Sequence, residues 1–226
     1  MAEPGRLIGQ GRRADIYDLG GGRVLRRYRE GARDVEREAE VMRHARAHGV
    51  PVPEVFDVAG TTDVVMEALV GPTMVEDLTR RPWTMLSHAR TLARLHESVH
   101  AVQALEWMRA PFGDGDRLLH VDLHPLNVIL TAGGPRIIDW EGVAKGPAEA
   151  DIAMCWVLMR TGDVPGPAAQ RFIGSAGQAF FARLFLSAVR PRLERHWLAT
   201  AAAFRVQDET VTPRERARLL RLTGDG

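Results

Sequence analysis

The sequence predicts an α+β fold in which short strands come first and helices follow. Before residue 70, short apolar runs are bounded by glycine and proline, a pattern typical of strands. From residue 84 onward, apolar residues recur at intervals of three and four, which indicates helices. We therefore expect residues 1–70 to be rich in strands and residues 71–226 to be mainly helical.

Composition narrows the class of protein. A chain of 226 residues with 45% hydrophobic content suits one domain, or two small lobes that share a cleft. A net charge of +1 gives no basic excess, so neither nucleic acid nor a membrane is expected as a partner. The N-terminus lacks the features of a signal peptide, no apolar stretch is long enough to span a bilayer, and the single Cys155 excludes an internal disulfide. We expect a soluble, cytoplasmic protein.

The first elements predict a glycine-containing loop and a strand. Gly9, Gly11, Ala14 and Ile16 fit the spacing G-x-G-x-x-A-x-I, in which glycines let backbone N–H groups approach phosphates. An ordinary β-turn explains the two glycines equally well. After a three-glycine turn, residues 23–28 have the character of a strand.

A helix and two further strands are expected next. Residues 34–48 place apolar side chains at i, i+4 and i+7, with Asp34 available as the N-cap. Residues 54–58 form an apolar run of strand length, and residues 64–71 are expected to form a buried strand that runs into a hinge. The longest helical periodicity then covers residues 84–105 and leads toward a polar loop.

The polar loop at residues 120–127 and the hairpin after it indicate phosphoryl transfer. Moving a phosphoryl group requires one group that orients the attacking hydroxyl and two oxygen ligands that hold Mg²⁺. In the pattern H-x-D-x-x-x-x-N, Asp122 suits the first role and Asn127 the second, and Asp139 follows the next strand as the other metal ligand. The alternative is a loop in which these side chains only satisfy backbone donors.

At these residues the chain resembles the aminoglycoside phosphotransferase and choline kinase superfamily. The loop of that family reads H-G-D-L-H-P-x-N, and its metal-binding strand ends in I-D-W or I-D-F, although Val121 here replaces the usual glycine. The resemblance implies a protein-kinase-like two-lobe fold, with an antiparallel β N-lobe, a mainly helical C-lobe and ATP between them. It implies that the γ-phosphoryl group of ATP passes to a hydroxyl of a small molecule, with Asp122 as the catalytic residue and Asn127 and Asp139 as Mg²⁺ ligands.

The same resemblance assigns the nucleotide-binding residues. It implies that Gly9 and Gly11 cover the phosphates and that Ile16 packs on the adenine. Met66 would border the adenine pocket, while the backbone of Glu67 and Leu69 would bond the adenine edge.

In kinases the strand that corresponds to residues 23–28 carries a phosphate-binding lysine, which this chain lacks there, whereas many members of the superfamily that the chain resembles write the strand as V-L-R-x-Y. The only lysine of this chain, Lys145, lies beyond the metal-binding strand, so the resemblance assigns the role to Arg26. Arginine keeps the charge, but its planar fork differs from a compact ammonium group. The partner on the following helix is expected to be Glu38, with Glu36 and Glu40 as alternatives.

Several polar residues are expected to support the site and not to react. His96 and His100 are spaced i, i+4 on a helix, but without a third ligand nearby in sequence they do not predict a zinc site. His120 and His124 are expected to shape the loop. The segment around Asp151 resembles the family pattern G-D-P-x-x-D-L-A, and this residue is expected to brace the loop through hydrogen bonds.

The C-terminal helices are expected to supply the acceptor pocket. They are expected near residues 168–189, 192–207 and 213–222, and from residue 156 onward arginines outnumber acids, including Arg160, Arg171, Arg183, Arg190, Arg192 and Arg195. Because a pocket for a polycation should be acidic, we expect a neutral or anionic small-molecule alcohol as acceptor.

Two other functions fit the sequence. A small atypical serine/threonine kinase that acts on proteins would suit the length, but such kinases usually have a strand lysine and D-L-T or D-L-S in the loop. A non-catalytic nucleotide-binding pseudokinase is suggested by the missing lysine, whereas the presence of Asp122, Asn127 and Asp139 argues against it.

Overall fold

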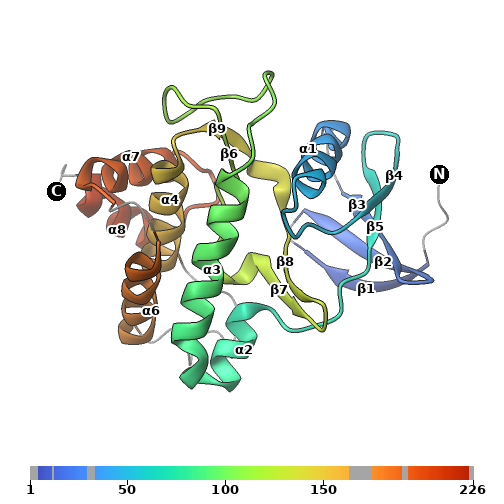
Figure 1. Cartoon of the computed structure of the whole chain (residues 1–226), viewed down its shortest axis with the longest axis horizontal. Helices are drawn as coiled ribbons and strands as arrows, with labels where there is room; N and C mark the ends of the chain where they lie inside the picture. The colour runs from blue at the N-terminus through green and yellow to red at the C-terminus, as the bar shows by residue number, and fades with distance from the viewer. Residues whose placement is uncertain (1–4, 12, 30–33, 163–174, 190–192, 224–226) are drawn as a thin grey trace. The chain divides into compact units, whose positions relative to one another are not determined.

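The computed structural model describes residues 5–11, 13–29, 34–162, 175–189 and 193–223 (Figure 1). The chain divides into two compact units. The first consists of Met1–Gly71 and Ile129–Glu141, and the second of Pro72–Val128 and Gly142–Gly226. The division at Gly71 lies beside the lobe boundary expected from the sequence, but the hairpin after the polar loop belongs to the first unit.

The first unit is built on a five-stranded antiparallel sheet in the order β1-β2-β3-β5-β4. The strands are β1 Arg6–Gln10, β2 Ala14–Gly20, β3 Arg23–Tyr28, β4 Val55–Ala59 and β5 Asp63–Glu67. The β2–β3 turn needs three consecutive glycines because all three have positive φ, at 74°, 59° and 74°. β5 ends at Glu67, within the segment expected as a strand that runs into a hinge, and the N–H of Ala68 bonds the carbonyl of Gly22 in that turn.

One helix and one hairpin complete the first unit. The helix α1, Val35–Ala47, begins where the carboxylate of Asp34 accepts a hydrogen bond from the N–H of Arg37, and it contacts β4 and β5. Its buried face includes the expected apolar positions, and Gly49 follows it with φ 83°. The hairpin pairs β7, Val128–Thr131, with β8, Gly134–Ile137, and the N–H of Ile137 donates to the carbonyl of Pro51 at 2.8 Å.

The second unit is mainly helical (Figure 1). Its described helices are α2 Met74–Arg80, α3 Met85–His100, α4 Ala148–Thr161, α6 Ser175–Ala188, α7 Arg195–Arg205 and α8 Pro213–Thr223. α4 contacts α6, α7 and α8, and α3 contacts α6. Two short strands, β6 Arg117–Leu119 and β9 Ala144–Gly146, pair antiparallel beside the polar loop.

Two helix boundaries differ from the sequence expectation. α3 ends at His100 and not at residue 105, because the chain turns so that Gln103 can pair with Arg117. Of the helix expected at 168–189, the described part is α6, since residues 163–174 lie outside the described residues.

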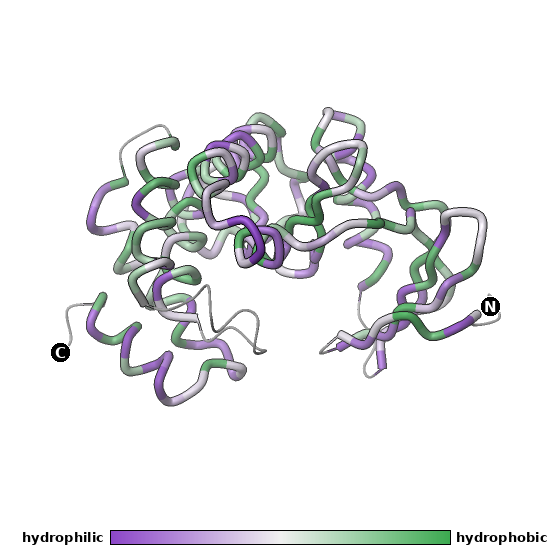
Figure 2. Tube along the Cα trace, turned by 90° about the horizontal axis from the view of Figure 1, so that it is seen from below, coloured by the Kyte–Doolittle hydropathy of each residue, from purple (hydrophilic) through white to green (hydrophobic). Residues whose placement is uncertain are grey.

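The last helix shows how the second unit is packed. Along α8, hydrophilic and hydrophobic residues alternate, as Figure 2 shows next to the C-terminus. Leu219 is fully buried and joins the cluster that contains Leu119, Ala153 and Ala202, so α8 covers the same core as α4 and α7. No helix in the described part of the chain is both long and apolar enough to cross a membrane.

Candidate active site

Asp151, at the start of α4, holds the polar loop of residues 120–127 in place. The carboxylate of Asp151 is fully buried and accepts hydrogen bonds from the N–H of Val121 at 2.6 Å and of His120 at 3.2 Å. Burial alone would raise the pKa of Asp151, but the hydrogen bond with His100 and the nearby ring of His96 outweigh it and hold the pKa well below its usual range. The bracing role expected for Asp151 is confirmed by these bonds.

Two residues of the site adopt a backbone conformation that normally favours glycine. Val121 has φ 70° and Asp139 has φ 65°. A left-handed conformation is uncommon for any residue with a side chain and is an outlier for a β-branched one. The valine therefore stands where the family pattern has glycine, at a position whose conformation explains that glycine.

Asp122 and Asn127 are brought together in the second unit. The side-chain N–H₂ group of Asn127 donates to the carbonyl of Asp122 at 2.9 Å and to its Oδ2 atom at 2.8 Å. Both partners are acceptors, so the amide orientation is fixed, and its oxygen, Oδ1, has no donor among the described residues. The 3₁₀ helix η2, Pro125–Asn127, starts after His124, whose ring accepts a bond from the N–H of Leu126 at 3.3 Å.

Histidines keep Asp122 ionised. The Nε2 atom of His124 lies 3.4 Å from the Oδ1 atom of Asp122, and the Nδ1 atom of His120 accepts a bond from the N–H of Asp122 at 3.3 Å. Burial alone would raise the pKa of Asp122, but His124, followed by His120 and Arg205, lowers it to about 2. His120 and His124 therefore shape the loop as expected. Arg205, on α7, is a contributor that sequence reasoning missed.

In the first unit, Arg26 on β3 forms a buried ion pair with Glu38 on α1. The side chains are only 12% and 7% exposed, whereas Glu36 and Glu40 are exposed, so the structure selects the expected partner. Burial would lower the pKa of Arg26, but the negative charge of Glu38 reverses this and raises it. Asp139 adds to the same effect.

Tyr28 is a third member of this group that the sequence analysis missed. Its hydroxyl donates to the Oε2 atom of Glu38 at 2.8 Å, and burial raises the pKa of Tyr28. Strand alternation could have identified Tyr28, because residues 26 and 28 of a strand lie on the same face.

The glycine-containing segment forms a hairpin. Gly9 on β1 lies opposite Ile16 on β2, and the N–H of Gly11 donates to the carbonyl of Ala14 at 2.8 Å. A Cβ atom at Gly11 would lie 3.2 Å from that carbonyl oxygen, which is a tight contact. Arg12, inside the motif, lies outside the described residues.

The residues expected at the adenine lie at the end of β5 and just after it. Met66 is buried and pairs with Val24 of β3. The N–H of Glu67 already donates to the carbonyl of Glu54 at 2.8 Å, so this N–H is used within the sheet. The expected site residues thus belong to two sets. Asp122 and Asn127 lie in the second unit, and the first unit contains Gly9, Gly11, Ile16, Arg26, Glu38, Met66, Glu67, Leu69 and Asp139.

The arginines noted in the sequence are described only in part. Arg160, Arg183 and Arg195 are described, whereas Arg171, Arg190 and Arg192 lie outside the described residues. The guanidinium of Arg160 lies over the ring of Trp156, 5.9 Å from its centroid.

An antiparallel sheet with one helix, and a helical unit whose buried aspartate holds an H-x-D-x-x-x-x-N loop, define a kinase-like phosphotransferase fold. The chain belongs to the phosphotransferase enzyme family (APH), whose model matches residues 5–119 and 91–187. The fold class and the family resemblance expected from the sequence are therefore confirmed.

Solved structures share the fold at low sequence identity. A gentamicin complex of the phosphotransferase APH(2")-IIa has a TM-score of 0.68 at 12% identity and covers 99% of this chain and 90% of that one. A thermostable mutant of APH(4)-Ia with AMP-PNP and hygromycin B has a TM-score of 0.65 at 17% identity, covering 97% and 93%. A choline/ethanolamine kinase family protein from Mesorhizobium loti has a TM-score of 0.62 at 15% identity, covering 98% and 88%.

Curated relatives match over a short stretch. Thiamine kinases of Salmonella strains are 44% identical over 39 residues. The match spans 17% of this chain and only 14% of the length of those proteins.

Proposed function

We propose that this protein is an ATP- and Mg²⁺-dependent phosphotransferase that moves the γ-phosphoryl group to a hydroxyl of a small molecule. The observation that carries the proposal is the pairing of Asp122 with Asn127. It sets an ionised carboxylate beside an amide oxygen that has no donor among the described residues. Membership in the phosphotransferase enzyme family supports the same reaction class.

In this proposal Asp122 orients the acceptor hydroxyl. A carboxylate whose pKa is about 2 is a weak base at neutral pH, but it is always ionised there and accepts a hydrogen bond from a hydroxyl. Its contribution is therefore to align the hydroxyl oxygen with the phosphorus atom, and to receive the proton late in the transfer. The bond from the side chain of Asn127 fixes the carboxylate in one orientation.

The residues assigned to Mg²⁺ have suitable chemistry. Hard dications prefer carboxylate and amide oxygens, and the Oδ1 atom of Asn127 is open to such a contact. We assign Asp139 as the second ligand. When bound, Mg²⁺ would neutralise charge on the phosphate oxygens.

We assign Arg26 to the phosphates in place of the usual lysine. Its ion pair with Glu38 holds the guanidinium in a fixed position and keeps it charged. Gly9 and Gly11 would let the backbone approach the phosphates, with Ile16, Met66, Glu67 and Leu69 around the adenine.

The acceptor that we propose is a neutral or anionic alcohol and not a polycation. Arg205 pairs with Asp208 at 2.6 Å and with Glu215 at 3.2 Å, so two of the acids near the end of α7 and the start of α8 already have a cationic partner. A polycation would be attracted by carboxylates that lack such partners.

The test is an acceptor screen with Mg²⁺ and ATP, read out by the mass of phosphate adducts. We expect adducts of a small-molecule alcohol. With that acceptor, Asp122→Ala should lower kcat by about 10²–10⁴-fold and leave nucleotide affinity largely unchanged. Asp116→Ala, at an aspartate whose side chain is 68% exposed, is the matched control and should keep full activity.

Three outcomes would overturn the proposal. Full turnover by Asp122→Ala would remove the assigned role of that residue. Labelling of proteins in a lysate without any small-molecule adduct would favour a protein kinase. Nucleotide binding without transfer to either class of acceptor would favour a non-catalytic nucleotide-binding protein.

A further inference from the structure

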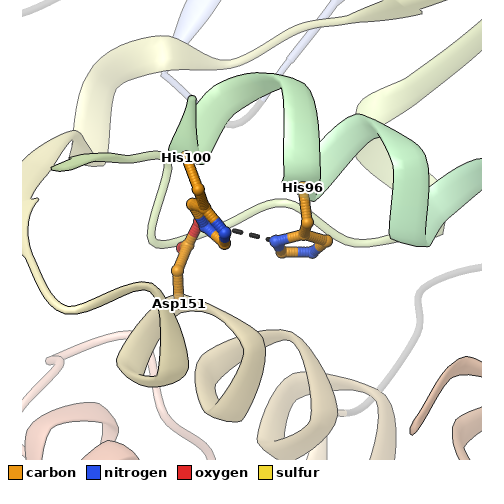
Figure 3. Close-up of side chains that lie close together, drawn as sticks. All are labelled: His96, His100 and Asp151. Carbon is orange, nitrogen blue, oxygen red and sulfur yellow. Dashed lines mark hydrogen bonds and ion pairs between the residues drawn. The ribbon is translucent and has the colours of Figure 1, made fainter. Parts of the chain in front are cut away.

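Two histidines and an aspartate of the second unit converge outside the residues assigned to phosphoryl transfer. Figure 3 shows that His96 and His100 extend from one helix, α3, toward Asp151 on α4. One potential ligand atom from each residue lies within 4.8 Å of the other two. The sequence offered no third ligand for the histidine pair, and Asp151, 51 positions after His100, supplies it.

The hydrogen bonds of His96 determine which of its nitrogens carries the proton. Its Nε2 atom lies 3.2 Å from the carbonyl oxygen of Leu123, which can only accept, so Nε2 must donate. In the neutral ring, Nδ1 is then an unprotonated acceptor. It is buried, has no hydrogen-bond partner in the described structure, and faces the Oδ2 atom of Asp151 at 3.5 Å.

A lone pair that faces a carboxylate oxygen in a dry interior is unfavourable unless a positive charge lies between them. The side chain of His96 is 1% exposed and that of Asp151 is fully buried, so water cannot screen the contact. The Nε2 atom of His100 lies 2.8 Å from the same Oδ2 atom. The Nδ1 atom of His96 and the Nε2 atom of His100 therefore both face the Oδ2 atom of Asp151.

We propose that His96 Nδ1, His100 Nε2 and Asp151 Oδ2 form a binding site for a borderline-soft transition-metal dication such as Zn²⁺. Zinc takes histidine nitrogen and carboxylate oxygen at about 2.0–2.2 Å, so neighbouring tetrahedral ligands lie roughly 3.3 Å apart. The separations of 3.5 Å and 2.8 Å bracket that value. The side chain of His100 is 10% exposed, so we expect a water molecule from the side of His100 to supply the fourth ligand.

The surrounding bonds suit a metal site. A metal-binding histidine usually donates its other N–H to a carbonyl or carboxylate, as His96 does to Leu123. The second oxygen of Asp151 is held by the N–H of Val121. Binding requires only that the proton of His100 move from Nε2 to Nδ1, and the ring stays neutral.

Filling this site would stiffen the loop around Asp122. Val121 and Leu123, the two neighbours of Asp122, are bonded to Asp151 and His96 respectively. A metal that fixes both side chains therefore limits motion on either side of the catalytic residue. Metal binding itself does not depend on the proposed reaction and is measured without turnover.

The experiment uses the full chain, freed of metal with a chelator and then titrated with Co²⁺ and Zn²⁺. We expect one equivalent of Co²⁺ to give the visible absorption bands of a four-coordinate site, and Zn²⁺ to remove them by displacement. Zn²⁺ should also raise Tm. His100→Gln, which changes the most accessible ligand, should weaken binding at least about 10-fold.

His88→Gln is the matched control. His88 also lies on α3, 2.7 Å from the carboxylate of Asp77, but it belongs to no such three-ligand group among the described residues. This variant should bind Co²⁺ like the unmodified protein. The proposal is overturned by the absence of stoichiometric binding, or by equal binding in His100→Gln and the unmodified chain; the three side chains then form only a hydrogen-bonded network. His96→Gln, if it folds, must lose binding as well.

Discussion

The side chain of Val121 is well packed, but its backbone conformation is unfavourable. Its side chain is 6% exposed and packs in the cluster with Leu119, Ala153 and Ala202, while its φ of 70° costs roughly 1–2 kcal/mol for a residue with a Cβ atom. The sequence identified the departure from glycine at this position. It did not reveal the strain, because φ is set by the bonds of the loop to Asp151.

This strain predicts an unusual order of stabilities for substitutions at Val121. In an ordinary extended position, glycine is less stable than alanine by about 0.5–1 kcal/mol. At Val121 we expect the glycine variant to be at least as stable as the alanine variant, because glycine relieves the left-handed strain. Urea unfolding of Val121→Gly and Val121→Ala measures the difference.

Val128 provides the control for this comparison. It is fully buried, like Val121 it belongs to the second unit, and its backbone is extended at φ −124°. Val128→Gly should therefore be less stable than Val128→Ala. The same order at both positions would show that Val121 is not strained.

At the scale of elements, β3 and α1 are joined by charged side chains in a nearly dry environment. Arg26 and Glu38 are buried against each other, and Tyr28 donates to the same carboxylate. The family resemblance indicated Arg26 and Glu38 as the pair, and local periodicity predicted both elements. The sequence could not separate Glu38 from Glu36 and Glu40, since only the packed helix shows which one faces the strand.

Replacing one residue of this pair should lower the stability of the protein more than replacing both. Arg26→Met or Glu38→Gln alone should each destabilise the protein by about 3 kcal/mol, because one buried charge is left without its partner. The double variant should recover much of that loss. Thermal unfolding of the three variants gives the coupling.

The exposed pair of Asp34 and Arg37, with side chains 55% and 60% exposed, serves as reference. Arg37→Gln, which removes this pair but keeps the Asp34 N-cap, should change the stability by less than about 1 kcal/mol. Strictly additive effects of Arg26→Met and Glu38→Gln would contradict the coupling that we expect.

At the scale of the whole molecule, the residues assigned to one reaction are distributed over both units. Asp122 and Asn127 belong to the second unit and Asp139 to the first. Asp139→Asn should weaken binding of Mg·ATP by about 10-fold or more, because the proposed carboxylate ligand is lost. Binding of ATP without Mg²⁺ should change little, and calorimetry with and without Mg²⁺ separates the two effects.

An exposed acid on the same unit tests the specificity of that result. Asp57 on β4 is exposed, and its carboxylate accepts a bond only from the N–H of Val58 among the described residues. Asp57→Asn should leave both affinities unchanged. An unaltered Mg²⁺ dependence in Asp139→Asn would remove Asp139 from the metal site.

The sequence was informative wherever chemistry is local in the chain. Asp122 and Asn127 are five positions apart, so a local pattern identified both residues, and the structure adds the contact between them. Asp151 and His100 are 51 positions apart, and no periodicity reports such a contact. For the same reason, the assignment of Ile129–Glu141 to the first unit required the folded structure.

Cys155 has a practical consequence. Its thiol is 1% exposed, and burial raises its pKa well above the usual range, so it forms little of the nucleophilic thiolate. The thiol of Cys155, which is the only cysteine in the sequence, should therefore not react with maleimide dyes. A pair of cysteines engineered on the surface, one in each unit, would then take fluorescent labels selectively, and energy transfer between the dyes could follow movement of the units as nucleotide is added.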